Sequence, residues 1–531
     1  RAGIFSADGT MLAHTMEPIE MWRPHPDFAE QSSEDIWSAI CKVVKECLAL
    51  SSVPKERVAG ISFDATCSLV VLDQKMKPLA VNAERDHDRN IIVWMDHRAL
   101  AETEEINSGK HDVLKFVGGR VSPEMEMPKL KWIKKNLPET WAQAGKFFDL
   151  ADFLCWRSTG IDVRSVCTVG CKWNYLSHEG EVGRWDTKYV KKIGLGDLFS
   201  EGKVVDDVQP MGSAQGYLTR LAAKELGLTT DCAVGVGIID AHAGGLGLLG
   251  NVWAGSKRRK LGDLENALAL IGGTSNCHMA VSREPRFIPG VWGPYFSAMV
   301  PGMWLAEGGQ SSAGSAIDHV IQSHANYSTL VIAAKRQKKT IYEVLNCEVA
   351  RIKSETKLGP EITRDVHVLP DFIGNRSPLA DPYVRGMIDG ISLDQSLESH
   401  ALVYYATVQA VAYGTRMIVE AMNRAGFEIT TLYVTGGGSK NPLWLQEHAD
   451  ATGCKIVLAK EPEAVLLGTA ILAATACGLY GDIYAAMQGM SSVGETVKPS
   501  KSTFKFHKRK YRAFLGLYLE HERRRQWMRK I

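Results

Sequence analysis

The same short pattern opens both halves of the chain, and it constrains the fold more than any other feature. Residues 2–13 hold two short apolar runs separated by the polar, glycine-containing turn 6–9. Residues 268–281 repeat this arrangement around the turn 272–276. Such runs predict strand–turn–strand units, and both are followed by segments with helical periodicity. With 531 residues, the chain is therefore predicted to hold two duplicated α/β domains that face each other across a cleft.

The run 233–239 is wholly apolar and is followed directly by Asp240. A continuous apolar run of this length is typical of a strand that is buried on both faces. A carboxylate at the end of such a strand could deprotonate a hydroxyl group or hold Mg²⁺. Aspartate is also a good helix N-cap, and its position alone favours the cap. Both roles stay open at this stage.

Two further charged residues stand in apolar surroundings. Glu307 comes at the predicted end of a strand and is followed by glycines. Lys172 lies in a run of low charge, where a buried lysine would need a partner. Taken separately, each is more consistent with a structural role, because the sequence alone does not show that they meet.

Glycine-rich turns after strands are a third kind of candidate site. Residues 436–441 follow a short apolar run and lead into a helix at Asn441. The N–H groups of such a turn and of the following helix hold phosphate, and glycine lets the ligand approach the main chain. Gly273 and Thr274 form a weaker candidate, because Gly-Thr-Ser is also ordinary turn composition.

Two common nucleotide-binding motifs are missing or misplaced. No G-x-x-x-x-G-K-[ST] occurs, so a P-loop NTPase is disfavoured. Residues 245–250 match G-x-G-x-x-G, but they lie several residues beyond the predicted strand, and no acidic second strand follows at the expected distance. We interpret this segment as a close-packed helix, so a nicotinamide dehydrogenase is a remote alternative.

The formal net charge of +2 conceals an asymmetry. Residues 501–531 hold 11 Lys/Arg against 2 Asp/Glu, which gives +9 and leaves −7 for residues 1–500. Residues 1–500 are thus mildly acidic, which excludes general nucleic-acid binding, because such binding needs a basic surface. In the tail, apolar residues recur at helical spacing, which predicts a terminal helix packed on the body with its Lys/Arg face in solvent.

Eleven cysteines are scattered without a C-x-x-C pair, and the odd count argues against a disulfide framework. Cys167 and Cys171 are four residues apart, but no second Cys/His pair nearby in the sequence completes a zinc site. Reduced thiols fit a cytoplasmic protein, which is the location that we expect. The uncharged, largely apolar stretch 464–481 contains glycines and predicts a buried helix rather than a membrane span.

Together, these motifs resemble those of the FGGY carbohydrate kinases. The segments 237–244, 271–275 and 434–442 occur in the order and approximate spacing that this family uses. The likeness covers almost the whole chain, including residues 94–98 and 121–128. Within the family, the chain is most similar to the FGGY-domain D-ribulokinase-type proteins, and the segments that carry this likeness are 170–173, 307–311 and 371–378.

The resemblance implies two ribonuclease-H-like domains of the actin/hexokinase/Hsp70 type on either side of a central cleft. Asp240 would be the general base and would also approach Mg²⁺. The other positions on the sugar side would be Cys67, Asp96, Arg98, Lys172 and Glu307. The positions on the nucleotide side would be Arg1, Gly273, Thr274, Gly437 and Asn441.

The resemblance also predicts the domain organisation. Residues 1–249 would form the sugar-binding N-terminal FGGY domain, and residues 250–531 the ATP-binding C-terminal domain with the basic helix 501–531. The family's first phosphate loop, D-x-G-T-x-S-x-R, is missing except for its last position, which Arg1 matches. Its aspartate helps to organise Mg²⁺, so we expect the natural chain to continue before Arg1.

The leading hypothesis is an ATP-dependent and Mg²⁺-dependent kinase that converts D-ribulose to D-ribulose 5-phosphate. The alternatives are a kinase for L-ribulose, xylulose or ribitol, and a non-kinase nucleotide-dependent protein of the same superfamily. Lys172 and Glu307, as sugar-side positions, argue against the non-kinase alternative. We expect ATP and a small sugar as ligands and neither nucleic acid nor membrane as a partner; a homodimer is compatible with this prediction.

Overall fold

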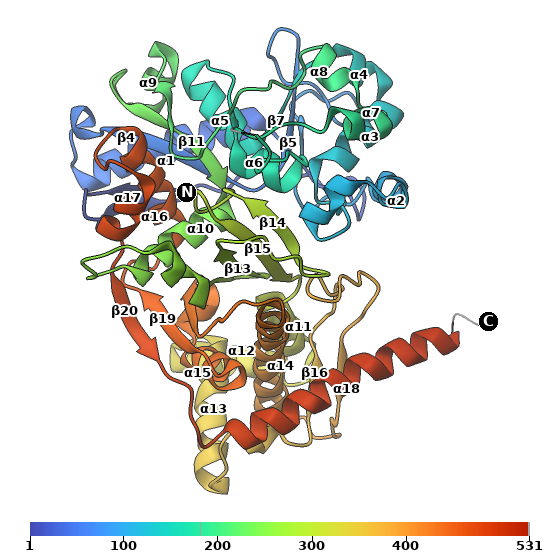
Figure 1. The fold of residues 1–531 in the computed structure, drawn as a ribbon. Helices are drawn as coiled ribbons and strands as arrows, with labels where there is room; N and C mark the ends of the chain where they lie inside the picture. Colours follow the sequence, from blue (N-terminus) through green and yellow to red (C-terminus); the bar gives the residue numbers. More distant parts are fainter. Residues whose placement is uncertain (181, 529–531) are drawn as a thin grey trace.

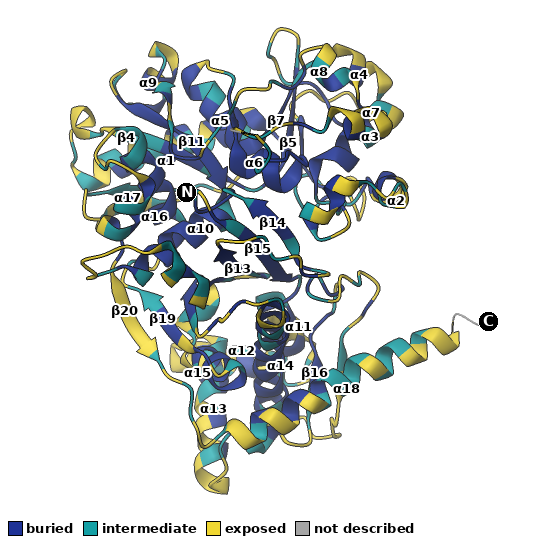
Figure 2. Ribbon diagram, in the orientation of Figure 1, coloured by how far each residue is buried: buried dark blue, intermediate teal, exposed yellow. Residues whose placement is uncertain are grey.

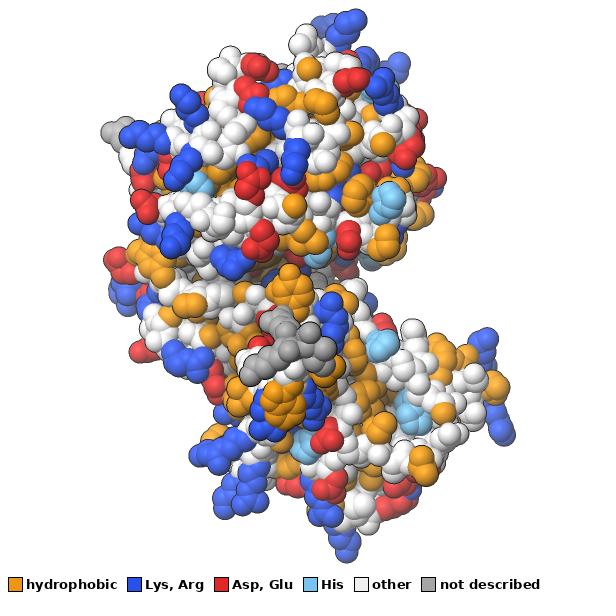
Figure 3. Space-filling model, turned by 90° about the vertical axis from the view of Figure 1, so that its right-hand side faces the viewer, with side chains coloured by type: hydrophobic (Ala, Val, Ile, Leu, Met, Phe, Trp, Pro, Cys, Tyr) orange, Lys and Arg blue, Asp and Glu red, His pale blue; other side chains and the backbone are white. Residues whose placement is uncertain are grey.

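The computed structural model describes residues 1–180 and 182–528 (Figure 1). Figure 1 shows two lobes, with the N-terminal half of the chain in one and most of the C-terminal half in the other. Both lobes combine helices and strands, which confirms the α/β class. In the space-filling view of Figure 3, the surface is hollowed between the lobes.

A seven-stranded mixed sheet forms the centre of the C-terminal lobe. Its inner strands β12, β18 and β19 run parallel, whereas β13 is antiparallel to both of its neighbours, β12 and β15. The order across the sheet is β14 (Trp292–Phe296), β15 (Trp304–Gln310), β13 (Asn276–Ser282), β12 (Ala267–Gly272), β18 (Thr431–Thr435), β19 (Lys455–Ala459) and β20 (Val493–Val497).

The N-terminal lobe contains smaller sheets. The hairpin β1 (Ala2–Phe5) and β2 (Met11–Thr15) confirms the predicted strand–turn–strand opening. Strand β11 (Ala233–Ile239) is buried along its whole length and pairs in parallel with β4 (Gly60–Ala65). A third sheet has the strand order β3 (Glu30–Gln31), β6 (Ile91–Ile92), β5 (Leu69–Asp73) and β7 (Ala144–Asp149). Strand β6 is only two residues long, because the chain leaves the sheet after Ile92.

The largest cluster of buried apolar side chains spans both halves of the chain. At its centre, α10 (Asp240–Leu249) packs directly on α16 (Ala464–Ala476). A Cβ atom added to Gly247 would lie 2.1 Å from the carbonyl oxygen of Ala464, so a larger residue would push the helices apart. This contact confirms the close-packed helix for residues 245–249, and Gly250 begins a short 3₁₀ turn that follows it.

One long helix crosses the C-terminal lobe. Helix α14 (Leu397–Arg424) begins after Ser396, whose side chain caps it. Gly426 has φ +100° just after the helix, a conformation that glycine adopts readily at a helix C-terminus.

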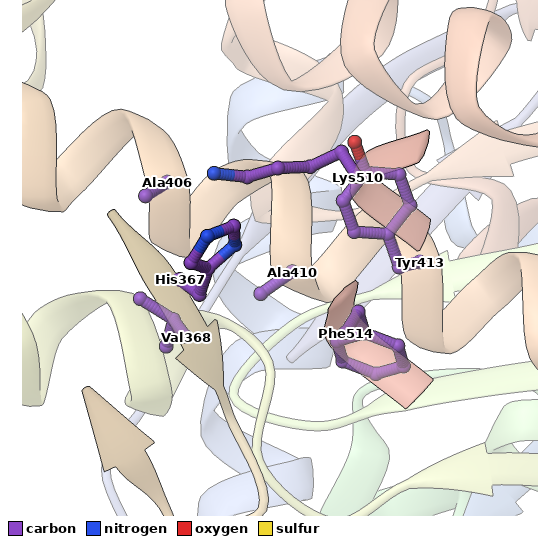
Figure 4. Close-up of a pocket in the computed structure, with 7 residues that line it drawn as sticks. All are labelled: His367, Val368, Ala406, Ala410, Tyr413, Lys510 and Phe514. Carbon is purple, nitrogen blue, oxygen red and sulfur yellow. The ribbon is translucent and has the colours of Figure 1, made fainter. Parts of the chain in front are cut away.

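The basic tail forms α18 (Phe504–Met528), which packs through Tyr511 and Phe514. Figure 2 shows that the buried residues of this helix are confined to its first half. Most Lys/Arg side chains of the described part of this helix are exposed, as predicted. Lys510 is an exception, because its ammonium is buried and donates to the carbonyl oxygens of Thr363 and Val366. Beside it lies a cavity of about 10 Å³ (Figure 4). This cavity has room for about one water molecule and none for a ligand.

Within the described residues, none of the helices is both long enough and apolar enough to cross a bilayer. All eleven cysteines fall in this part of the chain and carry free thiols, as the odd count predicted.

Candidate active site

Two aspartates lie side by side at the ends of two buried strands. Asp240 is the first residue after β11, and Asp64 lies near the end of β4. In the parallel pairing, Ile238 is opposite Asp64 and Ile239 is opposite Ala65, so the two carboxylates emerge at the same edge of the sheet. The sequence analysis missed Asp64, although it has the same signal as Asp240: an acidic residue at the end of an apolar run.

Hydrogen bonds hold both carboxyl groups in place, and burial raises the pKa of each. Thr469 of α16 donates to Asp64 Oδ2 at 2.6 Å, and the N–H group of Ala241 donates to Asp240 Oδ1 at 2.7 Å. Burial, and secondly the charge of Asp64, raise the pKa of Asp240 to about 6. Burial also raises the pKa of Asp64. Asp240 therefore has the pKa of a general base for neutral pH.

Lys172 and Glu307 meet between the lobes. Lys172 ends α6 (Val166–Lys172), and its Nζ lies 4.0 Å from Glu307 Oε2 and 4.3 Å from the ring centre of Trp292. Both side chains are almost completely buried. Burial alone would lower the pKa of Lys172, but Cys67, Glu307 and other neighbours raise it well above its ordinary value. The lysine is therefore a buried cation with an acidic partner.

The structure corrects the predicted location of Glu307. Strand β15 continues to Gln310, so Glu307 is in the middle of a strand and not at its end. Its Oε2 lies 3.6 Å from His242 Nε2, and it has no hydrogen-bond partner among the described residues. Burial lowers the pKa of His242 to about 4, so this ring is neutral at physiological pH. Cys67 is buried, and burial raises its thiol pKa.

A second pair of charges, which the sequence analysis did not select, bridges the two halves of the chain. Arg376 Nη2 lies 3.6 Å from Glu124 Oε1, and His97 Nε2 lies 3.9 Å from the same oxygen. Burial alone would raise the pKa of Glu124, but Arg376 and His97 lower it to about 2. Segments 121–128 and 371–378 carried the family resemblance, but nothing in the sequence showed that they meet.

Asp96 and Arg98 form a separate buried ion pair. Arg98 Nη2 donates to Asp96 Oδ2 at 2.7 Å and to Glu30 Oε1 at 2.8 Å, and its Nη1 donates to the carbonyl oxygen of Val81 at 2.9 Å. Asp96 Oδ2 also accepts from the N–H group of Ala29 at 2.6 Å. These contacts hold the segment beside the cleft, and they occupy the charged atoms of both residues.

The predicted phosphate turn lies at the tip of the β12–β13 hairpin, where Gly273 and Thr274 are exposed. Their carbonyl oxygens accept hydrogen bonds from the N–H groups of Gly314 and Ala313, at 3.0 Å each. The turn is thereby fixed against the start of α11 (Gly314–Ser323). Strands β12 and β18 are parallel neighbours, so this turn and the loop after β18 lie at the same edge of the sheet.

The loop after β18 contains the other two predicted nucleotide positions. Gly436 has φ +96°, and a Cβ atom there would lie 2.3 Å from the carbonyl oxygen of Gly272, so the loop contacts the hairpin. Gly437 is exposed. Asn441 caps α15 (Pro442–Thr452), with its Oδ1 accepting from Leu443 N–H at 3.1 Å.

Arg1, the remaining predicted nucleotide position, pairs with the start of α16. Its Nη1 lies 2.7 Å from Glu463 Oε2, and both side chains are partly exposed.

Two family models together match most of the chain. The family model described as "FGGY family of carbohydrate kinases, N-terminal domain" matches residues 1–247, and the model for the C-terminal domain matches residues 268–477. The chain belongs to the FGGY family of carbohydrate kinases. It is therefore a sugar kinase, as the resemblance predicted.

Relatives extend over nearly the whole chain. An "FGGY carbohydrate kinase domain-containing protein" of Homo sapiens is 48% identical over 528 residues, covering 98% of this chain and 94% of the human protein. A D-ribulokinase of Saccharomyces cerevisiae is 38% identical over 506 residues, covering 90% of this chain and 70% of the yeast protein.

A solved structure supports the fold. A ligand-bound xylulose kinase from Lactobacillus acidophilus superimposes with a TM-score of 0.78 at 17% identity, covering 97% of this chain and 94% of the other. The two-domain FGGY fold of the actin/hexokinase type is confirmed.

Proposed function

We propose that the protein transfers the γ-phosphoryl group of ATP to the 5-hydroxyl of D-ribulose, giving D-ribulose 5-phosphate and ADP. The observation that carries the proposal is the position of Asp240, a carboxyl group with a pKa of about 6 at the end of a buried strand. Lys172 and Glu307, which lie 4.0 Å apart and come from different halves of the chain, supply polar groups for a sugar. The 38% identity to the yeast D-ribulokinase supports D-ribulose as the sugar.

In this proposal, Asp240 is the general base. The 5-hydroxyl gives its proton to the carboxylate while its oxygen forms a bond to the γ-phosphorus. The bond between that phosphorus and the oxygen bridging to the β-phosphate breaks, and ADP leaves with the electron pair. The remaining residues contribute alignment, which supplies much of the rate enhancement in phosphoryl transfer.

The pair Asp64 and Asp240 fits a bound Mg²⁺. Magnesium prefers carboxylate oxygens, and the two acidic groups here raise each other's energy when both are ionised. The ion would neutralise charge on the transferring phosphoryl group. Thr469 keeps the Asp64 carboxylate in place through its 2.6 Å hydrogen bond.

The other predicted positions retain their proposed roles. Gly273 and Thr274 would meet the ATP phosphates, since they form the exposed tip of a fixed turn. Gly437 and Asn441 would contact the adenosine side, and Arg1 would contribute on the phosphate side.

On the sugar side, Cys67 would contact the ketopentose mainly through its main chain. Asp96 and Arg98 would act indirectly, since their charged atoms are occupied within their own buried pair. We also infer a cytoplasmic protein that binds ATP and a sugar.

A coupled ADP-release assay on the full-length protein tests the proposal. D-ribulose, L-ribulose, D-xylulose, ribitol, glycerol and a hexulose are compared at saturating ATP and Mg²⁺, and the phosphorylated product is identified by mass. We expect the highest kcat/KM with D-ribulose. Turnover only with glycerol or a hexulose would refute the ketopentose assignment, and a preference for xylulose or ribitol would replace D-ribulose.

A further inference from the structure

Cys167, Cys171 and His242 form a buried cluster that phosphoryl transfer does not use. The two cysteines are four residues apart on α6, so their side chains lie on the same face of the helix. His242 comes from the first turn of α10. All three side chains have no exposed surface, and their two sulfur atoms and one ring nitrogen lie within 4.8 Å of one another.

A fourth side chain points at the same nitrogen. Glu307 Oε2 lies 3.6 Å from His242 Nε2, and Cys171 Sγ lies 3.8 Å from the same nitrogen atom. This oxygen has no hydrogen-bond partner among the described residues, although its side chain is only 7% exposed. Lys172 Nζ, at 4.0 Å, is near enough to pair with this charge but too far to donate a hydrogen bond, so a metal cation is one group that would complete its coordination.

Two of the separations are close to those in a tetrahedral metal site. Zinc binds sulfur at about 2.3 Å and nitrogen or oxygen at about 2.0–2.1 Å, so neighbouring ligand atoms in a tetrahedron lie about 3.3–3.8 Å apart. The separations of 3.6 Å and 3.8 Å from His242 Nε2 fall in this range. The two sulfur atoms and this nitrogen lie within 4.8 Å of one another, and the Glu307 carboxylate, which is outside this group of three, would move toward the sulfur atoms to complete the site.

We propose that Cys167, Cys171, His242 and Glu307 bind one Zn²⁺ at the floor of the cleft. Thiolate and imidazole ligands select zinc over Mg²⁺, which prefers oxygen ligands. The two cations therefore have different sites in the same cleft. The sequence did not indicate the zinc site, because His242 is 71 residues from Cys171 and is not part of a second Cys/His pair.

The site has a regulatory consequence, which rests on the proposed function. Glu307 cannot hold both the metal and the sugar, and the metal would also take the carboxylate from Lys172, 4.0 Å away. Zn²⁺ should therefore inhibit reversibly, raising the apparent KM for D-ribulose and leaving the KM for ATP unchanged at saturating Mg²⁺.

Metal binding is tested without any activity measurement. Full-length protein is stripped of metal and titrated with Co²⁺, and we expect one equivalent to give intense thiolate-to-cobalt charge-transfer absorption that Zn²⁺ abolishes. Cys171→Ser should remove this absorption and Glu307→Gln should weaken Co²⁺ binding. Cys155→Ser, which changes another buried helical cysteine of the same lobe, should leave the titration unchanged.

Zinc X-ray absorption identifies the ligand atoms in the wild-type protein, so this test does not depend on whether a variant folds. The site predicts two sulfur neighbours at about 2.3 Å and two nitrogen or oxygen neighbours at about 2.0–2.1 Å. Failure to bind one equivalent of zinc, or a spectrum without two sulfur neighbours, overturns the proposal. A sulfur-ligated site in a protein that phosphorylates no sugar would overturn the proposed function and leave the zinc site standing.

Discussion

Lys172 Nζ lies 4.0 Å from Glu307 Oε2, and the two residues come from different lobes of the molecule. Lys172 ends a helix of the N-terminal half, and Glu307 is in the middle of a strand in the C-terminal sheet. The two charges are buried beside each other only because the lobes meet. The proposed sugar site is therefore assembled from both halves of the chain, and in this proposal its geometry depends on how the lobes close.

Removing either charge should weaken sugar binding. A hydrogen bond to a charged group is worth about 1.5–3 kcal/mol, so Lys172→Met and Glu307→Gln should each lower kcat/KM for D-ribulose by about 10- to 100-fold. Steady-state kinetics should place the loss mainly in the KM for the sugar. Lys188→Met, which changes an exposed lysine, is the matched control. An altered KM for ATP with an unchanged KM for the sugar would contradict these roles.

The pH profile should report the ionisation of Asp240. A base must be deprotonated to accept a proton, so kcat/KM should rise with pH and level off above about 6, the raised pKa of this carboxyl group. The measurement is kcat/KM for D-ribulose between pH 4.5 and 8.5, roughly the range in which one carboxyl group with this pKa titrates. A profile that is flat through pH 6 would exclude Asp240 as the titrating base.

Asp240→Asn should stabilise the protein at neutral pH. The folded-state pKa is raised from 3.8 to about 6, so the ionised form is disfavoured by folding. The resulting penalty is absent below pH 3.8, grows as the pH rises, and is complete above about pH 6. The free energy of unfolding should increase by about 1–3 kcal/mol at pH 7.5 and should not change near pH 3.8. Urea melts at the two pH values measure this difference, and equal stability at pH 7.5 would contradict it.

The loop after β18 offers a matched pair of glycines. Gly437→Ala has no atom closer than 4.0 Å to the added Cβ, so it should leave the melting temperature unchanged and raise the KM for ATP several-fold. Gly436→Ala should instead destabilise the protein by about 1–3 kcal/mol, because its φ of +96° is strained for alanine and its Cβ would lie 2.3 Å from the Gly272 carbonyl oxygen.

Gly481→Ala is the control for Gly437→Ala, since Gly481 also has room for a Cβ atom. If both variants leave the KM for ATP unchanged, Gly437 does not contact the nucleotide.

Local pattern was sufficient to predict the elements that carry the chemistry. The apolar run before Asp240 is a buried strand with the predicted bounds, and the glycine turns fall after β12 and β18 as expected. Asp64 had the same signal and was missed because its apolar run is shorter and contains serine.

Contacts between segments that are far apart in the chain could not be predicted from sequence patterns. The meeting of Glu124 with Arg376 depends on lobe packing, and periodicity says nothing about packing between lobes. The hydrogen bonds of Arg98 to Asp96 and Glu30 could not be predicted either, because Glu30 is 68 residues from Arg98 in the sequence. Glu307 was placed at a strand end because its following glycines imitate a turn, whereas backbone pairing with β13 extends the strand through them.

The turnover of Asp240→Asn tests the central claim most directly. Loss of a general base costs about 10²–10⁴-fold in rate, and asparagine keeps the size of the side chain. With D-ribulose and ATP, we expect kcat to fall by this factor while the affinity for the sugar, measured by calorimetry, changes only a few-fold. Asp231→Asn, at an exposed aspartate, should be unaffected. A kcat for Asp240→Asn close to that of the wild type would contradict the account.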